Sequence, residues 1–154
     1  MPLLVDTGAL YALADADDAL HRRMSDFIAS EHQTLLTPST VIPETAYLIR
    51  SRLGPHIEKM FVESLTDGEI IIENLTQPDL ARCAQLLGKY DFLGLVDASL
   101  VAVAERLKLK ALVTTDRRDF RRVRPKHFLA FELLPRSSRG LYCQLLTVNY
   151  RLFF

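Results

Sequence analysis

The stretch LLVDTGAL, residues 3–10, sets the pattern from which the fold can be inferred. Its three consecutive apolar residues are typical of a strand buried on both faces, and Asp6 follows them at a point where a buried carboxylate is costly. The stretch ALVTTD, residues 111–116, repeats this arrangement with Asp116. Acids that follow two buried strands are expected at the same edge of a parallel sheet.

Short apolar runs alternate with helical stretches along the rest of the chain. We predict strands at residues 3–5, 34–37, 69–72 and 111–114, a last apolar segment at 128–134, and helices at about 9–14, 18–30, 40–52, 55–65, 77–87 and 97–107. Strands that alternate with helices of this length indicate a parallel sheet covered on both faces. The expected fold class is α/β, a three-layer α/β/α sandwich with a central parallel sheet.

The composition restricts the classes of protein to which the chain can belong. Its 154 residues are 49% hydrophobic, which is enough for one buried core, and 19 basic and 19 acidic residues leave no formal net charge for general polyanion binding. Two distant cysteines and four scattered histidines argue against a disulfide framework and a zinc site. Without a cationic leader or an apolar run of the roughly 20 residues that span a bilayer, we expect a soluble cytoplasmic protein with no membrane partner.

Two further acids lie in apolar surroundings on predicted helices. Glu44 has apolar residues three before and four after it, which places its side chain on the inward-packing face. Asp97 begins a helix that is apolar nearly all round. Each acid has a purely structural alternative, because Asp6 and Asp97 fit helix N-caps, Asp116 fits a turn, and Glu44 fits the first turn of a helix. Four acids at corresponding ends of four elements nevertheless favour one shared site.

Convergence of these carboxylates would require a cation, because two like charges about 4 Å apart repel by about 4 kcal/mol even at an effective dielectric constant of 20. An all-oxygen ligand set without His or Cys suits Mg²⁺ or Mn²⁺. One or two such ions can generate hydroxide at neutral pH and stabilise the leaving oxygen of an in-line displacement. The predicted chemistry is metal-dependent phosphodiester hydrolysis, and the predicted catalytic and metal-binding residues are Asp6, Glu44, Asp97 and Asp116.

A basic segment follows directly after Asp116. Residues 117–126, RRDFRRVRPK, carry six cations and one acid in a chain without net charge. A charge run of this kind is often a plain solvated face, but next to the acids it favours the positioning of phosphates. Phe120 either stacks on a base or fills the core. The residues that we predict to bind the nucleic-acid backbone are Arg117, Arg118, Arg121 and Arg122.

Four segments, taken in order, resemble the PIN-domain family, and closely resemble the VapC-type toxin ribonucleases of bacterial toxin–antitoxin pairs. They are LLVDTGAL, TPSTVIPETAYLIR, YDFLGLVDASLVAVAERL and LVTTDRRDFRRVRPKHFLAFELLP. The resemblance covers about residues 2–135 and implies the family's fold and the Mg²⁺- or Mn²⁺-dependent cleavage of RNA by an endoribonuclease. It assigns the four acids named above to the acidic quartet of the family, with Asp6 and Asp97 as the foremost metal ligands.

The resemblance also implies auxiliary residues, partners and a domain boundary. Asp119 matches an additional acid, and three small hydroxyl positions are matched by Thr7, Ser39 and Thr115, for which helix capping is the alternative. Toxins of this type usually form homodimers and are inhibited by a small antitoxin protein. A nuclease domain is therefore expected at residues 1–135. The extension at 136–154 has no assigned role, and an added strand, a dimer contact and a shifted reading frame are alternatives for it.

Other functions remain as alternatives. A housekeeping RNA-processing nuclease would share the fold, and a small antitoxin gene upstream, or growth arrest relieved by co-expression, would distinguish a toxin from it. A haloacid-dehalogenase-type phosphatase requires a second acid two residues after the first, where this chain has Gly8. A non-hydrolytic magnesium-binding signalling module requires an Asp after a central strand, whereas Glu73 and Asn74 follow the strand at 69–72.

Overall fold

A computed structural model describes residues 1–136 of the chain and contains the predicted alternation of strands and helices. The strands are β1 (Leu3–Val5), β2 (Leu35–Pro38), β3 (Ile70–Glu73), β4 (Ala111–Val113) and β5 (Glu132–Leu134). The helices are α1 (Thr7–Ala14), α2 (His21–Ser30), α3 (Val41–Leu53), α4 (Pro55–Thr66), α5 (Gln77–Lys89), α6 (Leu95–Leu107) and α7 (Arg117–Arg122). Each predicted element is present, with small shifts at its ends.

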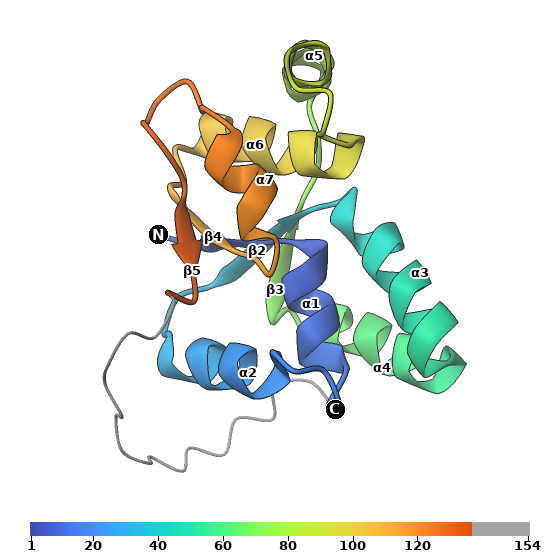
Figure 1. Cartoon of the computed structure of the whole chain (residues 1–154). Helices are drawn as coiled ribbons and strands as arrows, with labels where there is room; N and C mark the ends of the chain where they lie inside the picture. The colour runs from blue at the N-terminus through green and yellow to red at the C-terminus, as the bar shows by residue number, and fades with distance from the viewer. Residues whose placement is uncertain (137–154) are drawn as a thin grey trace.

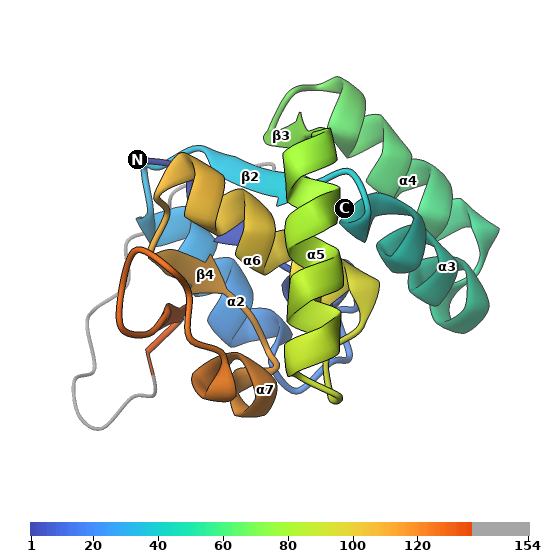
Figure 2. The same ribbon diagram turned by 90° about the horizontal axis from the view of Figure 1, so that it is seen from above.

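The five strands form one parallel sheet in the order β3-β2-β1-β4-β5. β1 lies at its centre, where Leu4 pairs with Leu36 on one side and Leu112 on the other. Figure 1 shows α5 and α6 on one side of the sheet and α1, α2 and α4 on the other, with α3 beside α1, and Figure 2 shows α5 and α6 from above. The predicted three-layer α/β/α sandwich is confirmed.

The α6 helix is buried on nearly every side, as its sequence predicts. All residues from Ala98 to Ala104 are buried, because α6 packs between the sheet and α5. Two charged contacts hold α5 against α6 at the outer surface: Arg82 pairs with Glu105 at 2.7 Å and Arg106 pairs with Asp79 at 3.0 Å. The C-terminal part of α6 is therefore fixed against α5.

The segment after β4 differs most from the prediction. The sequence analysis did not separate α7, because a six-residue helix with one apolar residue has no detectable periodicity. Phe120 is buried and its ring packs edge-on against Phe131 at 6.0 Å between centroids, so of its two alternatives the core position is confirmed. Of the predicted C-terminal extension, all but Arg136 lies outside the described residues.

Within residues 1–136, none of the helices has both the length and the apolar character that crossing a membrane requires.

Gly8 allows α1 to lie against the loop that follows β4. A Cβ atom added at Gly8 would be 2.1 Å from Thr115 Oγ1 and 3.4 Å from Thr115 Cβ. The missing side chain therefore makes room for the Thr115 hydroxyl. This contact joins the first turn of α1, which follows β1, to the loop after β4. These are the two places where acids follow buried strands.

We expect Gly8→Ala to destabilise the protein by about 1–3 kcal/mol, because its Cβ overlaps the Thr115 hydroxyl. In a Thr115→Ala background the overlapping oxygen is absent, and the preference of a helix for Ala over Gly, about 1 kcal/mol, should make the same substitution stabilising. Urea unfolding of the four members of this cycle measures both free energies. An equal effect of Gly8→Ala in the two backgrounds would contradict the contact.

Candidate active site

The carboxyl ends of β1 and β4 lie side by side and bring two of the predicted acids to one edge of the sheet. Val5 pairs with Val113, and the amide of Asp6 donates to the Val113 carbonyl at 3.1 Å. Asp116 follows three residues after Val113. We use the name acidic rim for Asp6 and Asp116 at these strand ends together with the two acids on the first turns of α3 and α6, Glu44 and Asp97.

Asp6 is the buried member of the acidic rim. It is 5% exposed, its Oδ1 accepts from the Ala9 amide at 2.7 Å as the N-cap of α1, and its Oδ2 accepts from the Thr114 hydroxyl. Burial is the main cause that raises the pKa of Asp6 to about 7; the charges of Asp97 and Asp116 contribute, and its hydrogen bonds oppose the rise. The alternative that Asp6 is a helix N-cap is therefore confirmed, and its raised pKa leaves the predicted metal-binding role open to it.

Asp97 faces the same rim from the first turn of α6. It is the third residue of the helix, and the N-cap is Gly94, so the alternative that Asp97 is the cap is wrong. Burial, together with repulsion from Glu44, Asp116 and Asp119, raises the pKa of Asp97 to about 6. Acids from α3, α6 and the segment after β4 thus lie within electrostatic reach of one another.

Glu44 does not pack inward as predicted. The buried stripe of α3 consists of Val41, Thr45 and Ile49, and Glu44 lies at the edge of that stripe, where its side chain is exposed. Its Oε2 accepts a hydrogen bond from the Thr7 hydroxyl at 2.5 Å. Glu44 therefore reaches the rim from the solvent side, and Thr7, one of the predicted hydroxyl residues, holds it there.

Asp116 and Asp119 lie at the start of α7. Asp116 is exposed and caps the helix, accepting from the amides of Arg118 at 3.1 Å and Asp119 at 3.3 Å. Asp119 is half-buried and forms an ion pair with Arg122 at 3.7 Å. Both carboxylates act on the pKa of Asp97, which places the predicted auxiliary acid next to the rim.

The sequence analysis missed Thr114, the hydroxyl that links two acids. Its Oγ1 donates to Asp6 and accepts from the Asp116 amide at 2.9 Å. Thr115, predicted in its place, packs against Gly8 instead. Ser39 binds the Glu73 carbonyl through its amide, and within residues 1–136 its hydroxyl makes no hydrogen bond to an acid. The available signal was position, because Thr114 directly follows β4, the neighbour of β1.

A second hydroxyl contact joins the two helices that carry Glu44 and Asp97. Ser99 is fully buried in α6 and donates to the Val96 carbonyl at 2.6 Å. Its oxygen is also 2.6 Å from Thr40 Oγ1 at the start of α3, and because the Ser99 proton is used, Thr40 is the donor. This bond fixes the N-terminal ends of α3 and α6 relative to each other.

The donor set of the acidic rim suits Mg²⁺ or Mn²⁺ in its chemistry, because it consists of carboxylate oxygens, two of which have raised pKa values that a cation would lower. In the described part of the chain, however, no three acidic, His or Cys side chains form a ready-made metal cluster. The predicted gathering of four carboxylates around one point is therefore not seen. Mg²⁺ usually keeps several waters and takes one or two carboxylates, so an open rim still fits such an ion.

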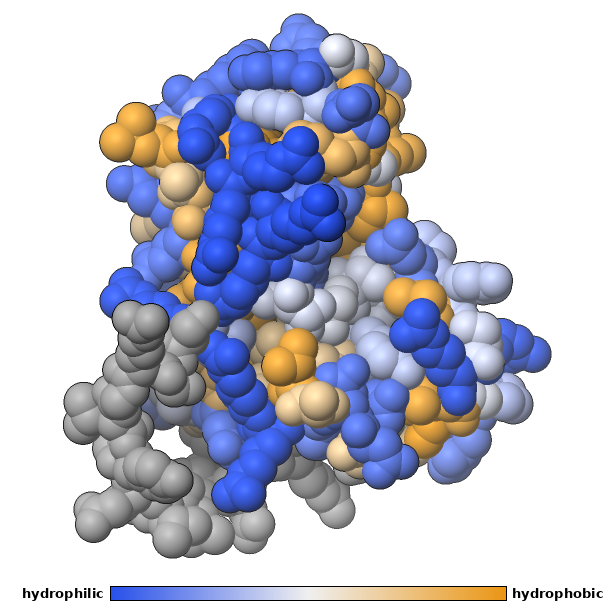
Figure 3. Space-filling model, viewed as in Figure 1, coloured by the Kyte–Doolittle hydropathy of each residue, from blue (hydrophilic) through white to orange (hydrophobic). Residues whose placement is uncertain are grey.

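The four arginines predicted to bind RNA have different surroundings. Arg118 and Arg121 are exposed. Arg122 lies over the ring of Phe92 at 3.7 Å from its centroid. Arg117 is half-buried and donates to a backbone carbonyl, and burial lowers its pKa. Figure 3 shows strongly hydrophilic side chains over α7 that continue toward α2, so the hydrophilic surface extends beyond residues 117–126.

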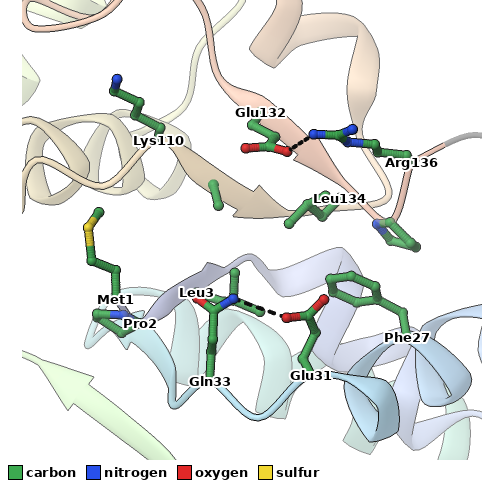
Figure 4. A pocket seen from close by; sticks show the side chains of 12 residues that line it. Met1, Pro2, Leu3, Phe27, Glu31, Gln33, Lys110, Glu132, Leu134 and Arg136 are labelled. Carbon is green, nitrogen blue, oxygen red and sulfur yellow. Dashed lines mark hydrogen bonds and ion pairs between the residues drawn. The ribbon is translucent and has the colours of Figure 1, made fainter.

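A larger cavity, of about 670 Å³, lies away from the acidic rim. Figure 4 shows it beside the starts of β1 and β4 and the end of α2, with Met1, Leu3 and Phe27 among its lining residues. Its acids are already occupied, because Glu132 pairs with Arg136 and Glu31 accepts from Gln33. The chemistry of the side chains therefore favours the acidic rim over this cavity as the candidate active site.

The chain is similar in sequence to known proteins. The PIN-domain family model matches residues 3–126. The chain is 30% identical over 135 residues to Ribonuclease VapC26 of Mycobacterium tuberculosis, a match that covers 86% of this chain and 100% of the relative.

Two solved structures have the same fold. VapC20 of M. tuberculosis, described as a sarcin-ricin loop cleaving toxin, superposes with a TM-score of 0.68 at 23% identity over 71% of this chain and 86% of that chain. A chain of a toxin–antitoxin complex from Klebsiella pneumoniae superposes with a TM-score of 0.62 at 23% identity, over 77% and 89% of the two chains. The match to residues 3–126 and the VapC relative show that this chain belongs to the PIN-domain family, within its VapC-type group.

Proposed function

We propose that this chain is the endoribonuclease toxin of a toxin–antitoxin pair and that it hydrolyses RNA phosphodiester bonds with Mg²⁺ or Mn²⁺ at the acidic rim. The observation that carries the proposal is that Asp6 and Asp116 follow adjacent strands and are joined by the Thr114 hydroxyl, while the charges of Asp97 and Asp116 contribute to the raised pKa of the buried Asp6. The similarity to a ribonuclease over 86% of the chain supports RNA as the substrate.

In this proposal Asp6 and Asp97 hold the metal ion, and Glu44 and Asp116 complete the site. When bound, such an ion activates water and stabilises the charge that develops on the phosphoryl group. Thr114 keeps one oxygen of Asp6 in place, and Thr7 does the same for Glu44. These hydroxyls reduce the freedom of the carboxylates, so that their geometry does not have to be organised during the reaction.

The basic surface over α7 would bind the phosphates on either side of the cleaved bond. Arg118 and Arg121 are exposed and carry this role most directly. Contacts of this kind position the substrate without reading its sequence.

An antitoxin protein and a second copy of the chain are the proposed partners, and RNA as substrate places the proposed action in the cytoplasm. One structural relative is itself a toxin–antitoxin complex, which supports the antitoxin. A housekeeping nuclease would use the same rim and the same chemistry, so the presence of an antitoxin, rather than the active site, separates the two functions.

Removal of the metal or of Asp97 should abolish RNA cleavage. We expect Asp97→Asn, or a chelator added to the wild-type protein, to lower the cleavage rate by on the order of 100-fold or more, because the ion loses a charged ligand or is absent. Cleavage of an end-labelled RNA followed on gels measures the rate, and Asp26→Asn, an exposed acid of α2, is the control. Activity that survives both treatments would refute the proposed mechanism.

The metal-free protein should lose stability as the pH rises from about 4 to 7. The folded chain keeps a proton on Asp6 that the unfolded chain has released, and a pKa raised from 3.8 to about 7 corresponds to a loss of roughly 4 kcal/mol across this window. Asp6→Asn, which can still cap α1, should flatten the slope, and Mn²⁺ should oppose the loss in the wild-type protein. Urea unfolding with chelator at several pH values measures this; a slope that Asp6→Asn leaves unchanged would exclude Asp6 as its source.

Neutralising the exposed arginines of α7 should weaken RNA binding and its dependence on salt. For the double variant Arg118→Gln, Arg121→Gln we expect the slope of log K against log salt concentration to fall by roughly 1.4, about 0.7 for each lost single-strand phosphate contact. Fluorescence anisotropy in chelator measures binding without cleavage. Lys59→Gln, an exposed cation of α4, is the control. An identical slope in the double variant would make this part of α7 an ordinary solvated surface.

A further inference from the structure

A small cavity of about 180 Å³ lies next to the acidic rim, between α2, the end of β4 and the start of α7. Leu20 and Met24 of α2 provide apolar lining, and Thr114 and Thr115 line it at the end of β4. Because Thr114 also donates to Asp6, one side chain separates the cavity from the buried acid of the rim. The volume equals about six water molecules at roughly 30 Å³ each, which is room for part of one nucleotide.

Two guanidinium groups from different helices meet at this cavity. Arg23 of α2 and Arg117 of α7 both line it, and both donate through Nη2 to the carbonyl of Pro135, Arg23 at 2.9 Å. Arg23 also donates to the Arg136 carbonyl at 2.5 Å. A neutral carbonyl oxygen brings the two cations together without cancelling their charge.

The approach of two like charges has a cost that an anion would remove. Both guanidinium groups donate to the same Pro135 carbonyl oxygen, so the two positive charges are held close together at the cavity wall. Each guanidinium has five N–H donors in a planar fork that matches phosphate oxygens. Arg23 lies on α2, outside the basic segment 117–126, and the hydrophilic surface in Figure 3 extends toward that helix.

We propose that Arg23 and Arg117 bind one phosphodiester group of the RNA next to the cleaved bond, and that the adjoining nucleoside enters the cavity over Leu20 and Met24. This subsite rests on the proposed ribonuclease function and adds to it a specific contact from α2. Arg23 is a positioning residue here: it binds the substrate backbone and takes no part in the chemistry at the acidic rim. Its contact fixes which bond lies over the acids.

The test starts from an RNA that the wild-type protein cleaves. In a set of modified RNAs, one phosphate at a time is replaced by an uncharged methylphosphonate, and each RNA is tested with the wild type and with variants of Arg23. For the wild type, one replacement near the cleavage site should lower kcat/KM by about tenfold, the size expected for a charge-assisted hydrogen bond. Arg23→Gln should lower kcat/KM of the unmodified RNA by a similar factor, chiefly through KM. In Arg23→Gln the same replacement should then have a clearly smaller effect than in the wild type, because only Arg117 still contacts that phosphate.

Arg22→Gln is the matched control, because Arg22 is the neighbouring cation on α2 with a side chain 92% exposed. Thermal unfolding of each variant shows whether loss of the Pro135 contact changes stability, and Arg23→Lys, which keeps the charge, should recover part of kcat/KM. Equal effects of Arg22→Gln and Arg23→Gln, or a loss in Arg23→Gln that is the same for every modified RNA, would overturn the subsite alone. A wild-type protein that neither binds nor cleaves RNA would overturn the proposed function together with the subsite.

Discussion

The carboxylate of Asp6 is buried at the end of the central strand, so its surroundings must compensate for the water that it has lost. Several contacts of the acidic rim meet this requirement. Asp6 is surrounded by protein, and its two oxygens are satisfied by the Ala9 amide and the Thr114 hydroxyl. Both bonds favour the ionised form, yet burial and neighbouring acids outweigh them and raise the pKa to about 7. The fold therefore holds a group that is half-protonated near neutrality and that a cation would convert to its charged form.

The rest of the rim is held in place by helix starts rather than by the sheet. Glu44 and Asp97 lie on the first turns of α3 and α6, and the bond between Thr40 and Ser99 joins those turns. Helix N-termini favour negative charge, which offsets part of the repulsion among the acids. Rigid elements thus hold like charges at a distance where they affect one another but do not form a closed cluster.

The sequence predicts the strands and the acids after them because buried parallel strands are short apolar runs and ligands collect at their carboxyl ends. It predicts less well the side-chain contacts that depend on how one element packs against another. Glu44 is exposed because the buried face of α3 runs through Thr45 rather than Glu44. A rotation of the helix by one residue is enough to make this difference. Thr114 rather than Thr115 contacts Asp6 because β4 pairs with β1 in one register. Arg23 meets Arg117 only through the folding of α2 against Pro135, and nothing in the local sequence indicates it.

The two sets of like charges form a complementary pair around the end of β4. Acids repel one another on one side of Thr114, and Arg23 and Arg117 repel one another on the other side. In the proposed function, a metal ion would relieve the first repulsion and a phosphate would relieve the second. An RNA backbone with a bound metal ion would supply a positive charge to the acids and a negative charge to the arginines. The same ligand would therefore stabilise both sets of side chains at once. Binding energy gained at the arginines can then position the bond over the acids, which is where positioning accelerates the reaction.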